Sequence, residues 1–247
     1  MINLPSLEDM LKAGMHFGHR TFKWYPKMAP YIFAKRNGVH IIDLRKSREN
    51  LGAAIEFMTK MIFDNKTILF VGSKTQVKKQ MEKTAKAVNM PYVTGKWLAG
   101  IVTNFAVIKK AINKYSKLVD EKKLGKLGKY TKKERLDFDR EIKRLEFKVG
   151  GLVSLKRLPD AIFVWDVKVE KNAILEAKKK NIPLIAVCDT NANPSGIKYV
   201  IPANDDATKT IKLVLSCVEK NLVEALSKKT ESAASGGKEP IKEIVKE

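Results

Sequence analysis

The sequence predicts an α/β domain in which helices cover both faces of a parallel sheet and a helical hairpin is inserted. Short continuous apolar runs, such as Thr67–Val71 and Leu184–Val187, are typical of strands buried on both faces. Segments with helical spacing of apolar residues separate these runs, and such alternation favours a parallel sheet. No repeat or linker divides the chain. We therefore expect a single domain over residues 1–226 and a mobile polar tail over residues 227–247.

The strands and helices follow one another along the chain in a regular way. The expected strands are Thr67–Val71, Pro91–Thr94, Ala161–Trp165, Leu184–Val187 and Tyr199–Ile201. The expected helices are Leu4–Gly14, Arg48–Asp64, a helix opened by a capping box at Ser73–Gln76, Lys171–Lys179 and Asp205–Leu226. Their apolar residues recur every three or four positions, which gives each helix one buried face. In the first of them, Leu7, Met10 and Leu11 share that face.

Between the second and third strands, Phe105–Val149 predicts an antiparallel pair of helices. Two apolar seams are separated by a break at Lys122–Thr131 that holds two glycines and reads as the turn. Ion pairs at helical spacing are expected for Asp139 with Lys143 and for Glu141 with Arg144. Residues 105–158 nevertheless hold 17 Lys and Arg against 7 Asp and Glu, a net charge of +10. Such an excess repels itself unless an anionic partner neutralises it.

Met15–Arg48 differs in kind from the rest of the chain. It mixes aromatic residues with eight Lys and Arg, two prolines and a single acid, Asp43. Aromatic rings stack on unpaired bases and basic groups neutralise phosphates, so this mixture suits RNA. The alternative is a loop-rich segment whose aromatic side chains fill the domain core. The spacing of His16 and His19 would place both on one helix face, as in some metal sites, but the only other histidine is His40 and no cysteine is nearby. We expect no metal site.

Composition narrows the class of partner and the compartment. The chain has 48 Lys and Arg against 27 Asp and Glu, a formal net charge of +21, which favours nucleic acid ahead of an anionic membrane. No apolar run is long enough to cross a bilayer, and the start lacks the basic and apolar regions of a signal peptide. Cys188 and Cys217 form no spaced framework, which suits a reducing compartment such as the cytosol or an organelle matrix.

Three strand ends carry polar residues where ligands bind in doubly wound folds: Gly72–Thr75, Asp166 and Asp189–Pro194. Gly72-Ser-Lys-Thr75 lacks the Gly-Lys-Ser/Thr order of a phosphate loop, so a nucleotide site is not expected there. Asp166 and Asp189 would serve as acid, base or metal ligand in an enzyme. No matched set of nucleophile, base and oxyanion donors accompanies them, so we expect no catalysis, no cofactor and no small-molecule substrate. The alternative is a flavodoxin-like enzyme that binds a nucleotide or a flavin.

Several motifs resemble the family of the second protein of the bacterial small ribosomal subunit. They span nearly the whole expected domain in the family's order: Ala13–Arg20, Trp24–Met28, Tyr31–Phe33, Ile41–Leu44, Phe70–Lys74, Trp97–Gly100, Thr103–Phe105, Leu158–Asp160, Asp189–Asn191 and Ile201–Asp206. The chain departs from the usual family pattern at Lys96, where arginine is common, at Ala192 and Asn193, and at Ala203. Lys96 keeps the charge of arginine without its bidentate geometry, so a contact there should be weaker or differently aimed.

The resemblance implies a flavodoxin-like sheet with a protruding coiled-coil hairpin, no catalysis, and binding to 16S ribosomal RNA. It also implies a position between the head and body of the subunit, beside the messenger-capturing first protein, in cytoplasmic or organelle ribosomes. No membrane partner is expected. The residues expected to contact RNA are His16, His19, Arg20, Lys23, Trp24, Lys27, Lys35, Arg36, Arg45, Lys46, Lys74, Lys96, Trp97, Asn104, Lys132 and Lys133.

Overall fold

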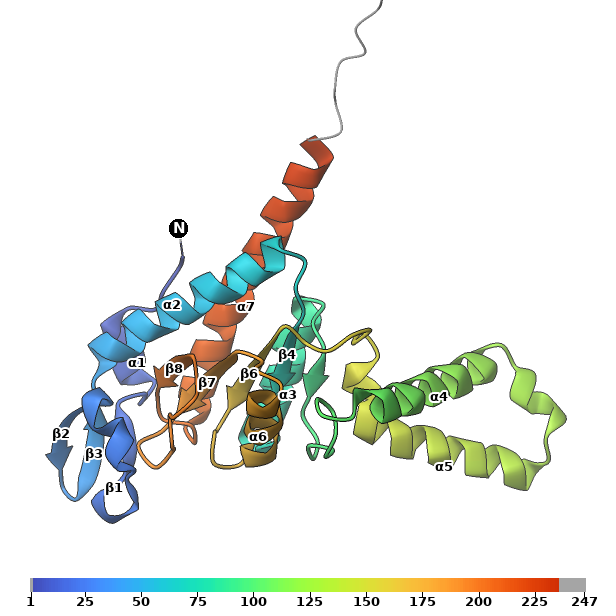
Figure 1. Cartoon of the computed structure of the whole chain (residues 1–247), viewed down its shortest axis with the longest axis horizontal. Helices are drawn as coiled ribbons and strands as arrows, with labels where there is room; N and C mark the ends of the chain where they lie inside the picture. The colour runs from blue at the N-terminus through green and yellow to red at the C-terminus, as the bar shows by residue number, and fades with distance from the viewer. Residues whose placement is uncertain (1, 236–247) are drawn as a thin grey trace, which may run out of the picture.

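The computed structural model describes residues 2–235, and five parallel strands form its centre (Figure 1). Side by side, they are β5 (Tyr92–Val93), β4 (Ile68–Val71), β6 (Ala161–Trp165), β7 (Leu184–Cys188) and β8 (Tyr199–Pro202). The chain thus starts near the middle, moves to one edge and then crosses to the other, as in flavodoxin-like folds. Every residue of β4, β6 and β7 is buried. The predicted fold class is confirmed, and each predicted strand lies within one residue of its observed bounds.

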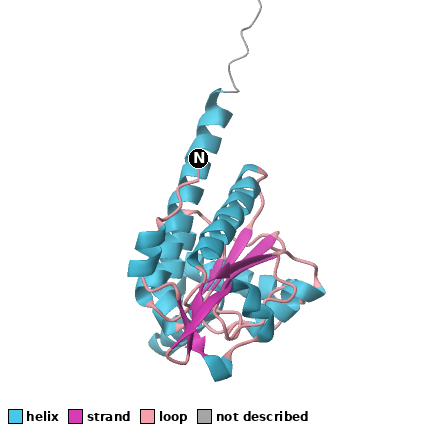
Figure 2. Cartoon of the chain, turned by 90° about the vertical axis from the view of Figure 1, so that its left-hand side faces the viewer, coloured by secondary structure: helices cyan, strands magenta, loops and turns pink. Residues whose placement is uncertain are grey.

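Helices cover both faces of this sheet, which lies between them in Figure 2. One face packs against α2 (Leu44–Phe63), α3 (Thr75–Ala87) and α7 (Thr208–Ser235). The other face packs against α6 (Lys171–Lys179), the loop that follows β5, and the base of the hairpin. Alternate residues of each strand enter the two cores, as the side-chain period of a strand requires. None of the helices within residues 2–235 is long and apolar enough to cross a membrane.

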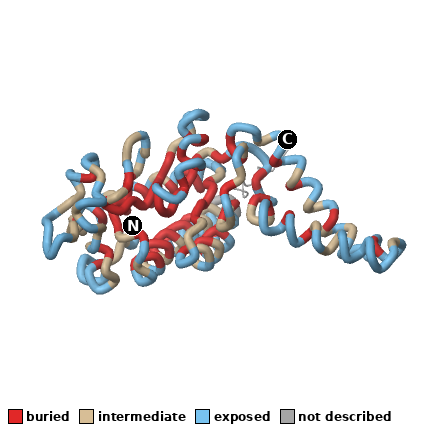
Figure 3. Tube along the Cα trace, turned by 90° about the horizontal axis from the view of Figure 1, so that it is seen from below, coloured by how far each residue is buried: buried red, intermediate tan, exposed pale blue. Residues whose placement is uncertain are grey.

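The hairpin consists of α4 (Phe105–Lys123) and α5 (Lys132–Val149), joined through the short 3-10 helix η3 (Lys126–Lys129). It projects from the body in Figure 1, and Figure 3 shows it exposed except along its seam. The buried seam residues are Ile108, Ile112, Leu118, Leu127, Ile142, Leu145 and Val149. Ion pairs join the two helices: Lys114 Nζ lies 2.9 Å from Glu141 Oε1, and Lys122 Nζ lies 2.7 Å from Asp139 Oδ1. The predicted ion pair between Asp139 and Lys143 is therefore wrong, because Asp139 pairs with Lys122. The predicted pair between Glu141 and Arg144 is confirmed.

Met15–Arg48, for which the sequence analysis predicts no strand, contains a second sheet. Its antiparallel strands β1 (Phe17–Arg20), β3 (Val39–Ile42) and β2 (Ile32–Arg36) lie in that order, and η1 (Thr21–Lys23) and η2 (Pro26–Tyr31) connect β1 to β2. Asn37 and Gly38, with φ of 49° and 74°, form the turn between β2 and β3. Asn-Gly is the strongest short-range signal for such a hairpin, because both central residues need positive φ. The sequence therefore contained the information that this prediction missed.

Several helix ends differ from the prediction. α2 begins at Leu44 rather than Arg48 because Asp43 caps it, accepting a hydrogen bond from the backbone N–H of Arg45. α3 has no capping box: its N-cap is Lys74, without a side-chain cap, and the Ser73 N–H is donated instead to Glu170. The first helix, α1 (Leu7–Lys12), buries Met10 but leaves Leu7 and Leu11 exposed.

The last helix also differs from the predicted one, which begins at Asp205 and ends at Leu226. α7 instead begins at Thr208, after Asn204 has bonded the N–H groups of Asp206 and Ala207. It continues through Ser235, so the first part of the predicted mobile tail is helical. The rest of that tail, residues 236–247, lies outside the described residues.

Candidate nucleic-acid interface

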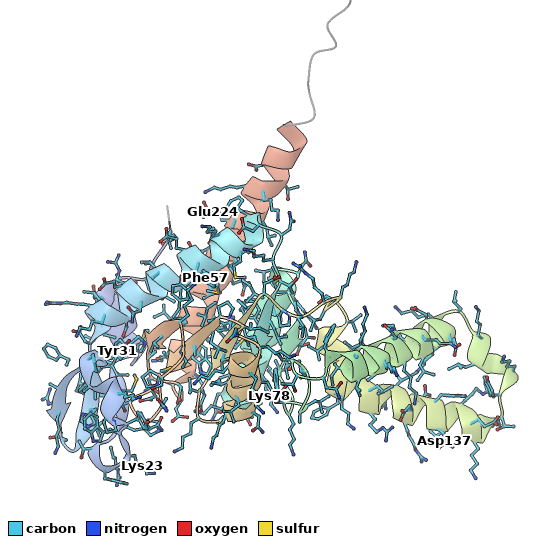
Figure 4. The ribbon with its side chains drawn as sticks, in the orientation of Figure 1. Lys23, Tyr31, Phe57, Lys78, Asp137 and Glu224 are labelled. Atoms are coloured by element: carbon cyan, nitrogen blue, oxygen red, sulfur yellow. The ribbon has the colours of Figure 1, made fainter. Side chains whose placement is uncertain are left out.

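The small sheet presents aromatic and basic side chains together on its exposed surface. Phe22 and Phe33 are 73% and 74% exposed, and the ammonium of Lys23 lies 5.6 Å from the centre of the Phe22 ring. Figure 4 shows Lys23 at the outer end of this region. The predicted contact residues that are exposed on or beside this sheet are Arg20, Lys23, Trp24, Lys27, Lys35, Arg36, Arg45 and Lys46. Exposed rings on which bases can stack thus occur in the same segment as exposed basic side chains.

Other aromatic residues of the same segment serve the core. Tyr25 and Tyr31 are partly buried and pack against the apolar cluster that includes Met28. The alternative, in which the aromatic residues of this segment fill the core, therefore holds for some of them. The exposed rings Phe22 and Phe33 fit the RNA-contact interpretation, and the partly buried rings Tyr25 and Tyr31 fit the core-filling one.

The end of β7 holds the small sheet against the main sheet. The N–H of Tyr25 donates to the carbonyl of Thr190 over 2.8 Å, and the N–H of His19 donates to the Thr190 hydroxyl over 2.8 Å. His19 Nδ1 also lies 3.1 Å from Asp189 Oδ2, which is 1% exposed. The Asp189 carboxylate, with Asp205 and Asp206 nearby, raises the pKa of His19 despite its partial burial. Both the backbone N–H and the ring Nδ1 of His19 thus have partners within the protein.

The remaining histidines are partly buried. Burial lowers the pKa of His16, whose ring lies 3.9 Å from that of Phe17. Burial and the charge of Lys35 likewise lower the pKa of His40, whose ring lies 5.1 Å from that of Trp24. Lowered pKa values favour neutral imidazoles, which add no positive charge for a phosphate. Within residues 2–235, no group of three or more His, Cys, Asp and Glu side chains could hold a metal ion.

Lys74 forms ion pairs with three of the acidic residues at and after the strand ends. Its ammonium lies 3.2 Å from Asp166, 2.9 Å from Asp205 and 2.5 Å from Asp206. Burial, together with repulsion from Asp166 and Asp189, raises the pKa of Asp205. Burial opposes the charge of Lys74, but its carboxylate partners outweigh burial and raise its pKa. Lys74 is one of the residues predicted to contact RNA, and within the protein it is paired with three carboxylates.

Asp166 and Asp189 also have structural partners. Asp166 accepts hydrogen bonds from the N–H groups of Lys168 and Val169, and Asp189 accepts one from Thr190. These carboxylates fix the loops after β6 and β7. Their geometry accounts for both residues without an acid, base or ligand role.

Glu176 of α6 organises the loop between β5 and the hairpin. This buried carboxylate accepts hydrogen bonds from the indole N–H of Trp97 and the backbone N–H groups of Gly100, Val102 and Thr103 at 2.8–3.1 Å. Burial alone would raise the pKa of Glu176, but these hydrogen bonds outweigh burial and lower it. Trp97 is 7% exposed with its N–H occupied, so it offers no ring face to an RNA base.

The sequence contained a weak signal for Glu176. It lies among Ala173, Ile174 and Ala177, which are buried on one face of α6. An acid beside an inward-facing stripe indicates a buried polar partner. The identity of that partner, a loop more than seventy positions earlier in the chain, was not evident from the sequence.

The other predicted contact residues are exposed but widely separated. Lys96 and Asn104 flank the loop that Glu176 holds, and Lys132 and Lys133 lie in the first turn of α5. The small sheet and the far end of the hairpin lie at opposite ends of the molecule in Figure 1. The predicted residues therefore do not form one site. They divide into the small sheet, the hairpin with its adjoining loop, and the partly buried, buried or paired residues His16, His19, Lys74 and Trp97.

Most of the chain is similar to known proteins. The family model described as Ribosomal protein S2 matches residues 10–225. A small ribosomal subunit protein uS2 from Flavobacterium johnsoniae is 47% identical over 227 residues, covering 92% of this chain and 89% of the relative. Proteins of the same name from Hahella chejuensis and Coprothermobacter proteolyticus are 44% and 40% identical, over 95% and 98% of this chain and 91% and 90% of each relative.

Proposed function

Because the chain belongs to the ribosomal protein S2 family, we propose that it is a structural constituent of the small ribosomal subunit, held there by binding 16S ribosomal RNA. The sequence resemblance that predicted this family is confirmed by the match over residues 10–225. The proposed setting is the cytoplasmic ribosome, or an organelle ribosome, where the chain takes part in translation.

The observation that carries RNA binding is the surface of the small sheet. Phe22 and Phe33 are largely exposed, Lys23 lies against the Phe22 ring, and Arg20, Lys35 and Arg36 are exposed in the same segment. Exposed rings of this size would be unfavourable in water without a partner, since burying one contributes about 1.5–3 kcal/mol. Unpaired bases cover rings by stacking while phosphates bind the basic groups, so RNA satisfies both features at once.

The hairpin supports a second role, which is to seat neighbouring ribosomal proteins. Its seam closes on itself, so its outer faces stay available for partners. The resemblance implies that the messenger-capturing first protein is among these neighbours, near the junction of head and body. We propose that the hairpin contributes to that contact.

Catalysis is not part of the proposed function. The carboxylates at the strand ends, where a flavodoxin-like enzyme would bind its nucleotide or flavin, are held by Lys74 and His19. The small sheet lies against the end of β7, at the same edge. Both features support a binding protein over the enzyme alternative.

The test replaces Arg20, Lys23, Lys27, Lys35 and Arg36 by alanine. These side chains are exposed, so the melting temperature should change little, while co-sedimentation with small subunits that lack this protein should fall. In the unmodified chain, the affinity for ribosomal RNA should decrease steeply with salt, because phosphates are neutralised by Lys and Arg.

A matched control removes five exposed lysines from other surfaces: Lys60, Lys179, Lys180, Lys212 and Lys220. If the two variants lose binding equally, net charge rather than the small sheet determines binding. If the first variant assembles normally, the small sheet is not the contact surface.

A further inference from the structure

A groove lies where the hairpin joins the body. It has a volume of about 340 Å³ and runs between α3, β5 and the end of α5. Lys78 and Lys79 line it from α3, Tyr92 from β5, and Phe147 and Lys148 from α5. Lys78 is labelled in Figure 4, on the body side of this junction. None of these residues is among the residues predicted from the sequence to contact RNA. The volume is at the lower end of the range for small-ligand sites.

Phe147 supplies the groove with an exposed aromatic ring. The side chain is 69% exposed although it lies close to the body. The ring atom Cζ is 3.6 Å from the position that a Cβ atom on Gly95 would occupy. Phe147 therefore lies beside bare backbone, in a helix whose seam residues face elsewhere. A ring so placed is available to a planar ligand.

The groove that holds this ring is lined by an excess of positive charge. Lys78, Lys79 and Lys148 have no ion pair within residues 2–235. The fourth lysine of the groove, Lys86, is neutralised by Glu82 at 2.6 Å. Glu146 is the remaining carboxylate that lines the groove. Three lysines thus stand against one acid, which favours an anionic ligand.

The edge of the main sheet is closed to a peptide strand at this point. β5 is the outer strand, and strand addition would need its free backbone groups. The short 3-10 helix η4 (Gly150–Leu152) covers it closely: a Cβ atom on Gly151 would lie 2.3 Å from the Tyr92 carbonyl oxygen. Only glycine allows this approach, so the groove is built over a blocked edge. This argues for a ligand recognised by its ring and its charge.

We propose that this groove holds one unstacked nucleotide of RNA, with its base on Phe147 and its flanking phosphates beside Lys78, Lys79 and Lys148. The inference rests on the proposed function, since the nucleotide would belong to the same ribosomal RNA. It adds a contact at the root of the hairpin, separate from the small sheet. Aromatic stacking with nearby ammonium groups is how proteins hold single-stranded RNA.

The experiment measures binding of the full chain and its Phe147→Ala variant to small-subunit ribosomal RNA. Phe147→Ala removes one stacked base and should weaken binding about tenfold. Phe147→Trp should bind like the parent, because tryptophan also stacks on bases. Leu136→Ala is the matched control, since Leu136 is a 50% exposed apolar residue of the same helix. It should bind like the parent. Lys148→Ala should lower the slope of log affinity against log salt by about one.

Ultraviolet cross-linking of the complex, followed by mass spectrometry of the peptides, gives a second measurement. We expect an RNA adduct on the peptide that contains Phe147. The inference is overturned if the parent binds RNA but Phe147→Ala binds equally well. It is also overturned if RNA alone gives no adduct at Phe147 and the groove cross-links only to an added ribosomal protein. Failure of the parent chain to bind any ribosomal RNA would instead refute the proposed function itself.

Discussion

The strand ends of the main sheet and the surface of the small sheet use charged residues in opposite ways. At the strand ends, Lys74 is largely buried and bound by three aspartates, and His19 lies beside Asp189. On the small sheet, Lys35 and Arg36 are exposed and no ion pair holds them within residues 2–235. Positive charge with a partner inside the protein fixes the fold. Positive charge without one is available to another molecule.

This difference shows what net charge leaves undetermined. The formal charge of +21 indicates an anionic partner, but it does not say which lysines bind that partner. Lys74 and Lys35 are equivalent in composition and differ in the carboxylates around them. The following changes test whether stability and RNA binding separate along this line.

Replacing Lys74 by alanine should have the largest effect on stability. The variant leaves Asp166 and Asp205 buried without a counter-charge, and breaking a buried pair in this way costs about 3–5 kcal/mol. Urea unfolding followed by circular dichroism measures the loss. Lys35→Ala is the control and should change the free energy of unfolding by less than about 0.5 kcal/mol. Equal stability of the two variants would contradict the distinction between paired and free lysines.

Replacing Glu176 by alanine should come next, because it leaves the Trp97 N–H and three backbone N–H groups without their acceptor. We expect a loss of about 2–3 kcal/mol, and a smaller loss for Glu176→Gln, which keeps one acceptor oxygen. The lowered pKa means that this stabilisation is present above the ordinary pKa of glutamate and disappears as the pH falls through the folded-state value. Urea unfolding at neutral and acid pH should therefore show the parent and Glu176→Gln converging in acid.

His19 should give a smaller effect with the opposite pH dependence. Its raised pKa means that its stabilisation is fully present below the ordinary value of 6.5 and disappears as the pH rises through the folded-state value. The difference in unfolding free energy between the parent and His19→Gln should shrink from mildly acidic to alkaline pH. Asp205 is present in both proteins, so its own titration largely cancels. A difference that grows with pH would show that the Asp189 contact does not favour the imidazolium.

Removing the distal half of the hairpin should change stability least while affecting binding. Excision of residues 114–140, with the stubs joined by a glycine-containing turn, keeps the seam residues Ile108, Ile112, Ile142, Leu145 and Val149. It removes ten Lys and Arg and five Asp and Glu. Shortening a surface segment alters stability by only about 0.6 kcal/mol for each halving of its length. Circular dichroism should report a folded domain and co-sedimentation should report weaker subunit binding. A folded variant that binds like the parent would show that the distal half of the hairpin contributes nothing to subunit binding.

The sequence was most informative where local pattern determines structure. The apolar runs that became β4, β6 and β7, and the seam from Ile108 to Val149, follow from periodicity alone. The small sheet was missed because its strands are short and lack clean alternation, although Asn37-Gly38 marked one turn. The partners of Lys74, Glu176 and Trp97 were missed for a different reason. Each depends on segments far apart in the chain, whose approach only the folded sheet defines.

The insertion of the hairpin between β5 and β6 also bears on how the chain folds. β6 must pair with β4 across residues 72–160, and such distant pairings slow folding because a long loop has to close first. The two hairpin helices contact each other locally, so they can associate before β6 is synthesised. Helices that form within microseconds would shorten the effective loop for the slower β4–β6 pairing. A preformed hairpin would therefore bring the start of β6 closer to β4, the strand with which it pairs.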